Sequence, residues 1–139
     1  MIVLDTNVVS ALMQREPEQR VVAWLDDQPS ESVWTTVITV FEIRFGLELL
    51  ADGRRRRRLE VAFAAALDED FAGRVLPFDQ NAADAAGSIA AHQRKHGQTV
   101  EIRDVQIAGI VGTRKATLAT RNLRHFEGLG LKLIDPWTA

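Results

Sequence analysis

Short apolar stretches alternate with longer amphipathic segments along the whole chain, and this alternation restricts the possible folds. Each short stretch is bounded by polar or turn residues, as buried strands are. Strands that alternate with helices indicate parallel βαβ units. We therefore expect an α/β three-layer sandwich, in which helices flank both faces of a central, mostly parallel five-stranded sheet. The predicted strands are Ile2–Leu4, Ser32–Thr36, Arg74–Phe78, Thr117–Thr120 and Lys132–Ile134.

The segments between these strands carry helix signals. Pro17 suits the first turn of a helix, and Gly97 suits the position just after one. No repeat or linker interrupts the alternation, so residues 1–139 are predicted to form a single domain. The predicted helices are 8–13, 17–29, 37–50, 55–71, 81–96 and 104–113, with one more helical turn between strands four and five.

Composition excludes several classes of protein. The chain has no cysteine, which rules out disulfides, thiolate zinc sites, iron–sulfur clusters and a cysteine nucleophile. Its net charge of −2 gives no overall basic field, so any contact with nucleic acid must come from a local patch. No apolar run approaches the roughly 20 residues that span a bilayer, and no signal peptide opens the sequence. We expect a cytoplasmic protein with no membrane partner.

Four polar residues fall where ligands bind in open α/β sheets, beyond the carboxyl ends of the strands. Asp5 follows the first strand directly, and Glu42 lies in the helix after the second. Asp104 opens a later helix, and Asn122 follows the fourth strand. Separate segments therefore deliver three carboxylates and one carboxamide toward the same end of the sheet.

Each acid also has a structural interpretation. Asp5 and Asp104 stand at predicted helix starts, where either carboxylate suits an N-cap. Glu42 lies on an apolar helix face with Phe45 and Leu49, and we expect this face to be buried. A lone carboxylate on a buried face is unfavourable unless it is paired or binds a metal. The less favoured alternative for Glu42 is a salt bridge at the rim to an arginine elsewhere in the chain.

Convergence of the three acids favours a metal site over separate caps. Like charges that gather at one place repel each other unless a cation lies between them. Hard carboxylate oxygens suit Mg²⁺ or Mn²⁺, and such ions support metal-assisted hydrolysis of phosphodiesters. We therefore take Asp5, Glu42 and Asp104 as candidate metal ligands.

The histidines and the arginine run give weaker signals. His92 and His96 are one helical turn apart and suit either a zinc pair or a polar helix end, while His125 has no identifiable partner. The run Arg54–Arg58 points in all directions on a helix, so it suits a solvated turn balanced by nearby acids. A patch that contacts phosphate or a protein partner is equally consistent with it.

Four motifs stand in order along the chain: VLDTNVVSAL at 3–12, TVITVFEIRFGL at 36–47, EIRDVQIAGIV at 101–111 and ATRNLRHFEGLGLKLIDPW at 119–137. DTN and RD are short motifs, but four motifs in this order at these separations are specific. Together they resemble PIN-domain ribonucleases, in particular bacterial toxins of the VapC and FitB type, and the resemblance covers essentially the whole chain.

The resemblance implies a Mg²⁺-dependent endoribonuclease toxin of a type II toxin–antitoxin pair, with Mn²⁺ as a possible substitute. Asp5 and Asp104 match the family's metal-binding acids, and Glu42 matches its third acid, which holds metal directly or through water. Thr6 and Asn7 would then cap and position the helix. Family members usually form homodimers, are inhibited by a cognate antitoxin, and bind operator DNA through that antitoxin.

Two departures leave alternatives open. Some relatives carry a fourth acid where this chain has Asn122, and related chains often have Asp where this one has His125. Because Asn122 is uncharged, an alternative function remains open. In this alternative the chain is a catalytically weak PIN-fold binding module that acts mainly through its antitoxin complex in transcriptional repression. A magnesium-dependent phosphatase would also place an acid at Asp5, although the DxD pairing typical of such sites is missing.

Overall fold

Five strands form one sheet in the computed structural model, which describes residues 1–139. All four strand pairs are parallel, so the predicted mostly parallel five-stranded sheet is confirmed and contains no antiparallel pair. The third strand is shorter than predicted. In sheet order, the strands are β3 (Val75–Leu76), β2 (Val33–Thr36), β1 (Ile2–Leu4), β4 (Thr117–Ala119) and β5 (Lys132–Ile134).

Seven α-helices connect and flank these strands, and none is long and apolar enough to cross a membrane. The helix predicted over 55–71 ends earlier, at Ala65, and continues as a π-helical turn, η2 (Ala66–Asp70). A 3₁₀ turn, η1 (Ser30–Ser32), precedes β2. The helices are α1 (Thr6–Leu12), α2 (Gln19–Asp26), α3 (Val37–Leu49), α4 (Arg54–Ala65), α5 (Gln80–Lys95), α6 (Ile102–Thr113) and α7 (Leu123–Phe126).

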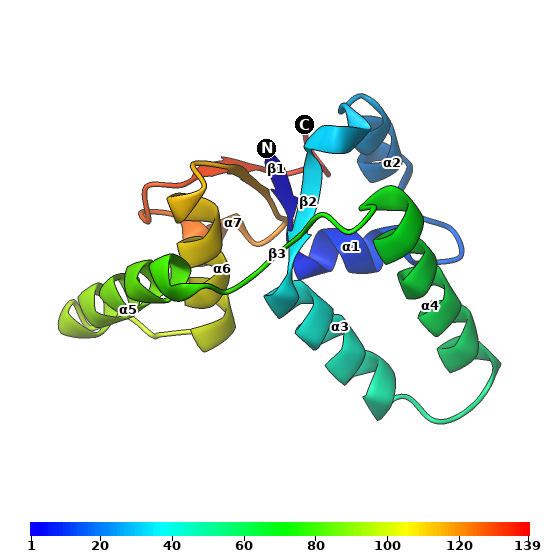
Figure 1. The fold of residues 1–139 in the computed structure, drawn as a ribbon, viewed down its shortest axis with the longest axis horizontal. Helices are drawn as coiled ribbons and strands as arrows, with labels where there is room; N and C mark the ends of the chain where they lie inside the picture. The colour runs from blue at the N-terminus through cyan, green and yellow to red at the C-terminus, as the bar shows by residue number, and fades with distance from the viewer.

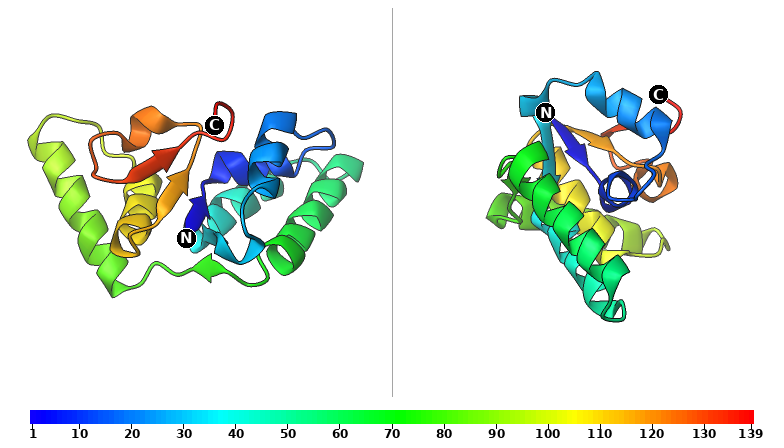
Figure 2. Two further views of the ribbon diagram at one scale, coloured as in Figure 1. Left: turned by 90° about the horizontal axis from the view of Figure 1, so that it is seen from above. Right: turned by 90° about the vertical axis from the view of Figure 1, so that its right-hand side faces the viewer.

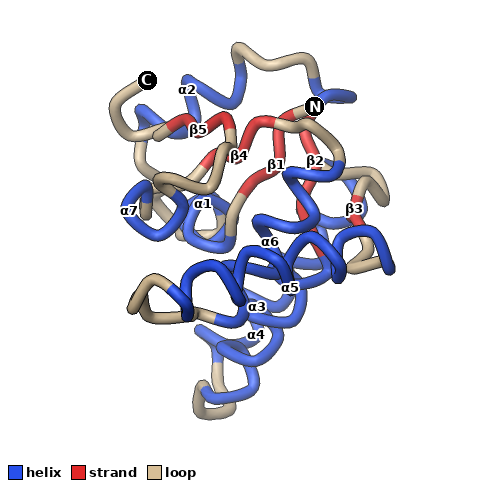
Figure 3. Tube along the Cα trace, turned by 90° about the vertical axis from the view of Figure 1, so that its left-hand side faces the viewer, coloured by secondary structure: helices blue, strands red, loops and turns tan.

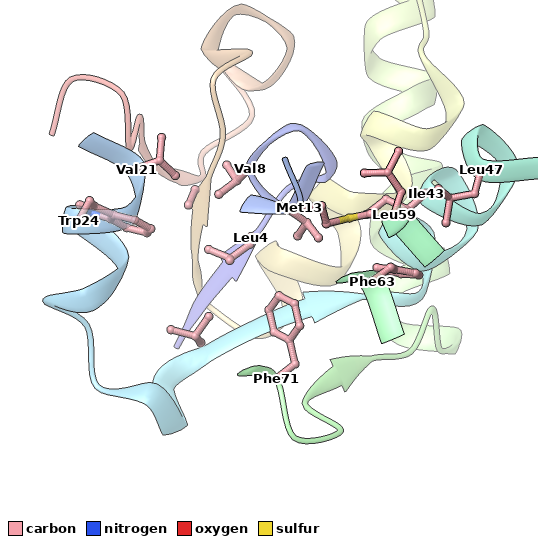
Figure 4. Close-up of a cluster of buried hydrophobic side chains, with 13 residues drawn as sticks. Leu4, Val8, Met13, Val21, Trp24, Ile43, Leu47, Leu59, Phe63 and Phe71 are labelled. Carbon is pink, nitrogen blue, oxygen red and sulfur yellow. The ribbon is translucent and has the colours of Figure 1, made fainter. Parts of the chain in front are cut away.

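The sheet separates two groups of helices and two apolar cores (Figure 1). Successive side chains of a strand point to opposite faces, so Val3 joins one core and Leu4 the other. Helices α1–α4 cover the face that contains Leu4, and α5–α7 cover the face that contains Val3, as the view from above shows (Figure 2). Figure 4 shows the first core, in which side chains from α1 to α4 meet those of β1.

Helices α5 and α6 lie side by side on the second face (Figure 3). Their close approach depends on Gly109, because a Cβ atom there would lie only 2.4 Å from the Ala82 carbonyl oxygen and 3.0 Å from the Ala86 Cβ atom. The start of α6, where Asp104 lies, is near the end of α5, because residues of both line one cavity.

Strand β1 lies between β2 and β4. After β1 the chain forms β2 and β3 on one side of it, and later forms β4 and β5 on the other side. Ligands of open α/β sheets bind at such switch points. The backbone N–H of Asp5 donates to the Ala119 carbonyl at 2.9 Å, which joins the ends of β1 and β4 at this place.

Candidate active site

Asp5 is buried at the switch point, with only 5% of its surface exposed. Its Oδ1 atom accepts from the backbone N–H of Thr6 at 2.8 Å, so Asp5 itself caps α1. Its Oδ2 atom accepts from the Thr120 hydroxyl at 2.8 Å and from the Asn7 side chain at 3.3 Å. The expectation that Thr6 and Asn7 would cap α1 is therefore wrong, and capping leaves this carboxylate available for a second role.

Thr6 and Asn7 instead connect α1 to the rest of the site. The Thr6 hydroxyl donates to Glu42 Oε1 at 2.8 Å and lies 3.1 Å from the Thr39 hydroxyl. Asn7 Oδ1 accepts from the backbone N–H of Arg121 at 3.1 Å, just after β4. The first turn of α1 thus holds both α3 and the segment after β4 in place.

The pKa of Asp5 is raised above its ordinary value, first by burial and then by the negative charges of Asp104 and Glu42. Hydrogen bonds from the Thr120 hydroxyl and the Thr6 backbone act in the opposite direction. Burial is the largest of these effects, and the pKa of Asp5 is therefore raised on balance.

Glu42 lies beside this cluster with 22% of its side chain exposed. Its Oε2 atom is 3.6 Å from an Arg103 guanidinium nitrogen, so the alternative of a salt bridge to a distant arginine is confirmed. The guanidinium also lies over the rings of Phe41 and Phe45, 5.2 and 5.6 Å from their centres. The prediction that Glu42 sits on a buried face is wrong, because Phe45 and Leu49 are both exposed.

Asp104 lies in the first turn of α6, which begins two residues earlier than predicted, so Asp104 is not an N-cap. Its Oδ2 atom is 2.8 Å from His125 Nδ1, and His125 therefore has the partner that the sequence did not reveal. Burial raises the pKa of Asp104, and the charges of Glu42 and Glu101 add to this rise, while His125 opposes it. Each pair among Asp5, Glu42 and Asp104 thus repels.

The donors of this cluster fit a hard divalent cation. Asp5, Glu42 and Asp104 offer only oxygen atoms, and their mutual repulsion would be relieved by positive charge. No three acidic or histidine side chains are grouped closely enough to hold one ion directly. Mg²⁺ commonly binds one or two carboxylates and keeps several waters, so the donor set suits an ion of this kind.

Asn122 lies at the same end of the sheet but is exposed and precedes α7. Its backbone N–H donates to the Thr120 hydroxyl at 3.0 Å, and its side chain makes no hydrogen bond to the three acids. Thr120 is a functional candidate that the sequence argument missed. The predicted strand Thr117–Thr120 included this residue, and the structure places it just after β4, as Asp5 lies just after β1.

The other histidines, His92 and His96, lie at the end of α5. The rings of His92 and His96 are 4.0 Å apart, and His96 Nδ1 lies 2.8 Å from the His92 carbonyl oxygen. No further acidic or histidine side chain joins them in a group that could hold an ion.

Only one arginine of the run Arg54–Arg58 is held by several acids. The Arg56 guanidinium lies 2.8 Å from Glu48, and 3.2 Å from both Asp52 and Glu60. The other four arginines are exposed. Neighbouring acids therefore balance part of this run, as the solvated-turn interpretation expects.

Comparison with known proteins agrees with this geometry. The family model described as PIN domain matches residues 2–130. The chain is 39% identical to VapC ribonuclease Y4jK of Sinorhizobium fredii, a match that covers 99% of this chain and 98% of that protein. It is 36% identical to Toxin FitB of Neisseria gonorrhoeae, with 99% of both chains covered.

A solved structure shares the fold over the same length. The structure of FitAB bound to an IR36 DNA fragment superimposes with a TM-score of 0.88 at 36% identity, covering 99% of this chain and 96% of that one. The resemblance inferred from the four sequence motifs is thus confirmed, and the chain belongs to the PIN-domain family.

Proposed function

We propose that this protein is a Mg²⁺- or Mn²⁺-dependent endoribonuclease toxin of a type II toxin–antitoxin pair. The observation that carries the proposal is the buried Asp5 carboxylate at the switch point. Burial and the negative charges of Asp104 and Glu42 raise the pKa of this carboxylate. Such a cluster is unfavourable alone and favourable around a cation. The similarity to a protein named VapC ribonuclease supports RNA as the substrate.

Asp5 and Asp104 would hold the ion directly, with Glu42 acting directly or through water. A bound divalent cation would supply Lewis-acid polarisation of a phosphoryl oxygen and a water of lowered pKa. The chain's own hydrogen bonds keep these acids in position. Thr6 and Thr120 fix the Asp5 oxygens, Thr6 also holds Glu42, and His125 holds Asp104.

Asn122 would take part through its carboxamide oxygen, which orients water but brings no charge. A second ion would therefore be bound less tightly than the first, and we propose one strong metal site. The whole chain, residues 1–139, would serve as a single PIN domain that carries it, because its strands all join one sheet.

A homodimer is the proposed assembly. The exposed face of α3 carries Phe41, Phe45 and Leu49, and Ile102 at the start of α6 is exposed as well. The rings of Phe41 and Phe45 stack with centres 6.0 Å apart. An exposed apolar group of this kind is typical of a protein–protein interface, and it supports a second copy as the partner.

A cognate antitoxin is the second proposed partner, and operator DNA would be bound indirectly, through the antitoxin. The similarity to the FitAB complex bound to a DNA fragment supports this assignment. The proposed site of action is the cytoplasm, where both RNA and a repressible operator are available.

Cleavage of a mixed RNA pool by antitoxin-free protein tests the proposal, with Mg²⁺, with Mn²⁺ and with chelator. We expect cleavage with either ion and none with chelator. Protein that binds Mg²⁺ and its antitoxin but leaves all RNA intact would support the weak binding module instead. The uncharged Asn122 is the feature that favours that second candidate.

A further inference from the structure

We propose that a polar cavity beside Asp104 receives a nucleobase of the RNA strand and that Gln93 reads the edge of this base. The inference rests on the proposed function, because it specifies which bases of the proposed RNA substrate the protein prefers. The cavity has a volume of about 460 Å³, which is within the range of small-ligand pockets. Its walls include Gln93, Gln98, Thr99, Asp104, Arg124 and His125.

Gln93 supplies the observation that points to a ligand. Its side chain is 9% exposed, and its Oε1 atom is buried without any hydrogen-bond partner. An unpaired buried acceptor is unfavourable and needs a donor that the chain does not provide. Gln93 lines the cavity, so rotation of its carboxamide toward a molecule bound there would supply Oε1 with that donor.

The end of α5 brings a second carboxamide to the same wall. Gly97 has a positive φ of 71°, and the backbone N–H groups of Gly97 and Gln98 donate to the carbonyls of Arg94 and Gln93 at 3.1 and 2.8 Å. This Schellman motif turns the chain back, so Gln98 and Gln93 line one cavity. Gln98 is exposed, which leaves its carboxamide free to take part.

The opposite wall provides a surface for stacking. Single-stranded bases bind proteins by stacking on aromatic rings or arginine guanidinium planes while side chains read their edges. His125 is about half exposed, and its ring is held through Nδ1 by Asp104. Arg124 lines the same cavity. A base stacked here would lie next to the proposed catalytic acids.

The charges of the cavity favour a base over a phosphate group. Three carboxylates line it, from Glu101, Asp104 and Glu127, and they would repel a phosphate. These acids and the unpaired Gln93 Oε1 are acceptors, so the matching base presents an N–H donor. Adenine, cytosine and guanine present an exocyclic amine with two N–H groups, whereas uracil presents only N3–H, which lies between two carbonyl oxygens that the carboxylates of the cavity would repel. The cavity therefore selects an amine-bearing base and disfavours uracil.

Binding of short single-stranded oligoadenylate, oligocytidylate and oligouridylate, measured by fluorescence anisotropy with chelator present, tests this directly. We expect the intact protein to bind oligouridylate about tenfold more weakly than the other two, the effect of about one lost hydrogen bond to a buried acceptor. Gln93→Leu should remove the difference. The control Gln80→Leu, on an exposed side chain of the same helix, should retain it.

Sequencing the ends of products from a randomised RNA pool provides the second readout. We expect uracil to be depleted at one position beside the cut for the wild type and for Gln80→Leu, and equal use of the bases for Gln93→Leu. Uracil discrimination that persists in Gln93→Leu would overturn the pocket, and so would equal binding of the three oligonucleotides by the wild type.

The two proposals fail in different ways. Protein that cleaves no RNA but discriminates against oligouridylate through Gln93 would contradict the nuclease and keep the base pocket. Protein that cleaves RNA, but whose base preference does not depend on Gln93, would support the nuclease and contradict the base pocket. If Gln93→Leu lacks the thermal transition of the wild type, Gln98→Leu replaces it, because that side chain is exposed and its loss should reduce discrimination without unfolding the chain.

Discussion

Replacing Gly109 by alanine would force α5 and α6 apart. The new Cβ atom would lie 2.4 Å from the Ala82 carbonyl oxygen and 3.0 Å from the backbone nitrogen of Ala86. Ordinary van der Waals contact begins near 3.4 Å, so the shortest distance is about 1 Å too small. The obstructing atoms belong to a helix backbone, which cannot rotate away as a flexible side chain would.

The magnitude follows from two opposing effects. Overpacking of a well-packed interior costs about 1–3 kcal/mol, and a clash with backbone falls at the upper end of this range. Alanine in place of glycine within a helix recovers about 1 kcal/mol. We therefore expect the free energy of unfolding of Gly109→Ala to fall by about 2 kcal/mol, which lowers the Tm by about 8 °C for a chain of this length.

Gly112→Ala is the matched control, because it places the same substitution in the same helix. Its Cβ atom would meet only Leu131 Cδ2, at an ordinary 3.5 Å. The helix-propensity gain then acts alone, and we expect stability to rise by about 0.5–1 kcal/mol. Urea denaturation followed by circular dichroism measures both variants.

Equal stability of the two alanine variants would refute this account of the helix packing. So would a Gly109→Ala variant that is as stable as the wild type. Either result would mean that α5 moves readily on α6, and the fixed position of Asp104 beside α5 would lose its physical basis.

Three further predictions concern single side chains. Asp5→Asn should unfold at the same or a higher temperature than wild type in chelator at pH 7, since the raised pKa of Asp5 means that its ionisation destabilises the fold. By the same sign, calorimetry should show this advantage shrinking as the pH falls through the raised pKa of Asp5, and absent below the ordinary aspartate pKa. Thr6→Val removes the 2.8 Å hydrogen bond to Glu42, so metal affinity measured by calorimetric titration should fall, by about tenfold, while the fold persists. Arg56→Met should lower the Tm more than Arg55→Met, because only Arg56 is held by several acids; an equal effect would contradict the observed network.

The order of strands and helices could be predicted because each short apolar run is bounded locally. Ile2–Leu4 ends at Asp5, and Lys132–Ile134 ends just before Asp135 and Pro136. Helix and strand ends that depend on tertiary packing were harder to predict from the sequence. The helix that begins at Arg54 changes to a π-helical turn at Ala66, and no composition break marks that point.

The candidate acids were visible in the sequence because Asp5 follows a strand, Asp104 stands at a predicted helix start and Glu42 interrupts an apolar helix face, but their partners were not. His125 bonds to Asp104 across 21 positions of the chain, and Arg103 reaches Glu42 from another helix. Such pairs depend on how elements pack, which a single sequence does not encode locally. The exposure of Phe45 and Leu49 beside Glu42 was misjudged for the same reason.

Cleavage of one RNA substrate by wild type, Asp5→Asn, Asp104→Asn and the control Asp84→Asn tests the central claim most directly. Asp84 is exposed on α5 and has no ion-pair partner, so its variant loses the same charge away from the site. With Mg²⁺ present, we expect wild type and Asp84→Asn to cut RNA at equal rates, and the other two variants to remain folded and inactive. Cleavage by Asp5→Asn or Asp104→Asn at the wild-type rate would contradict the assignment of these carboxylates as the metal-binding site.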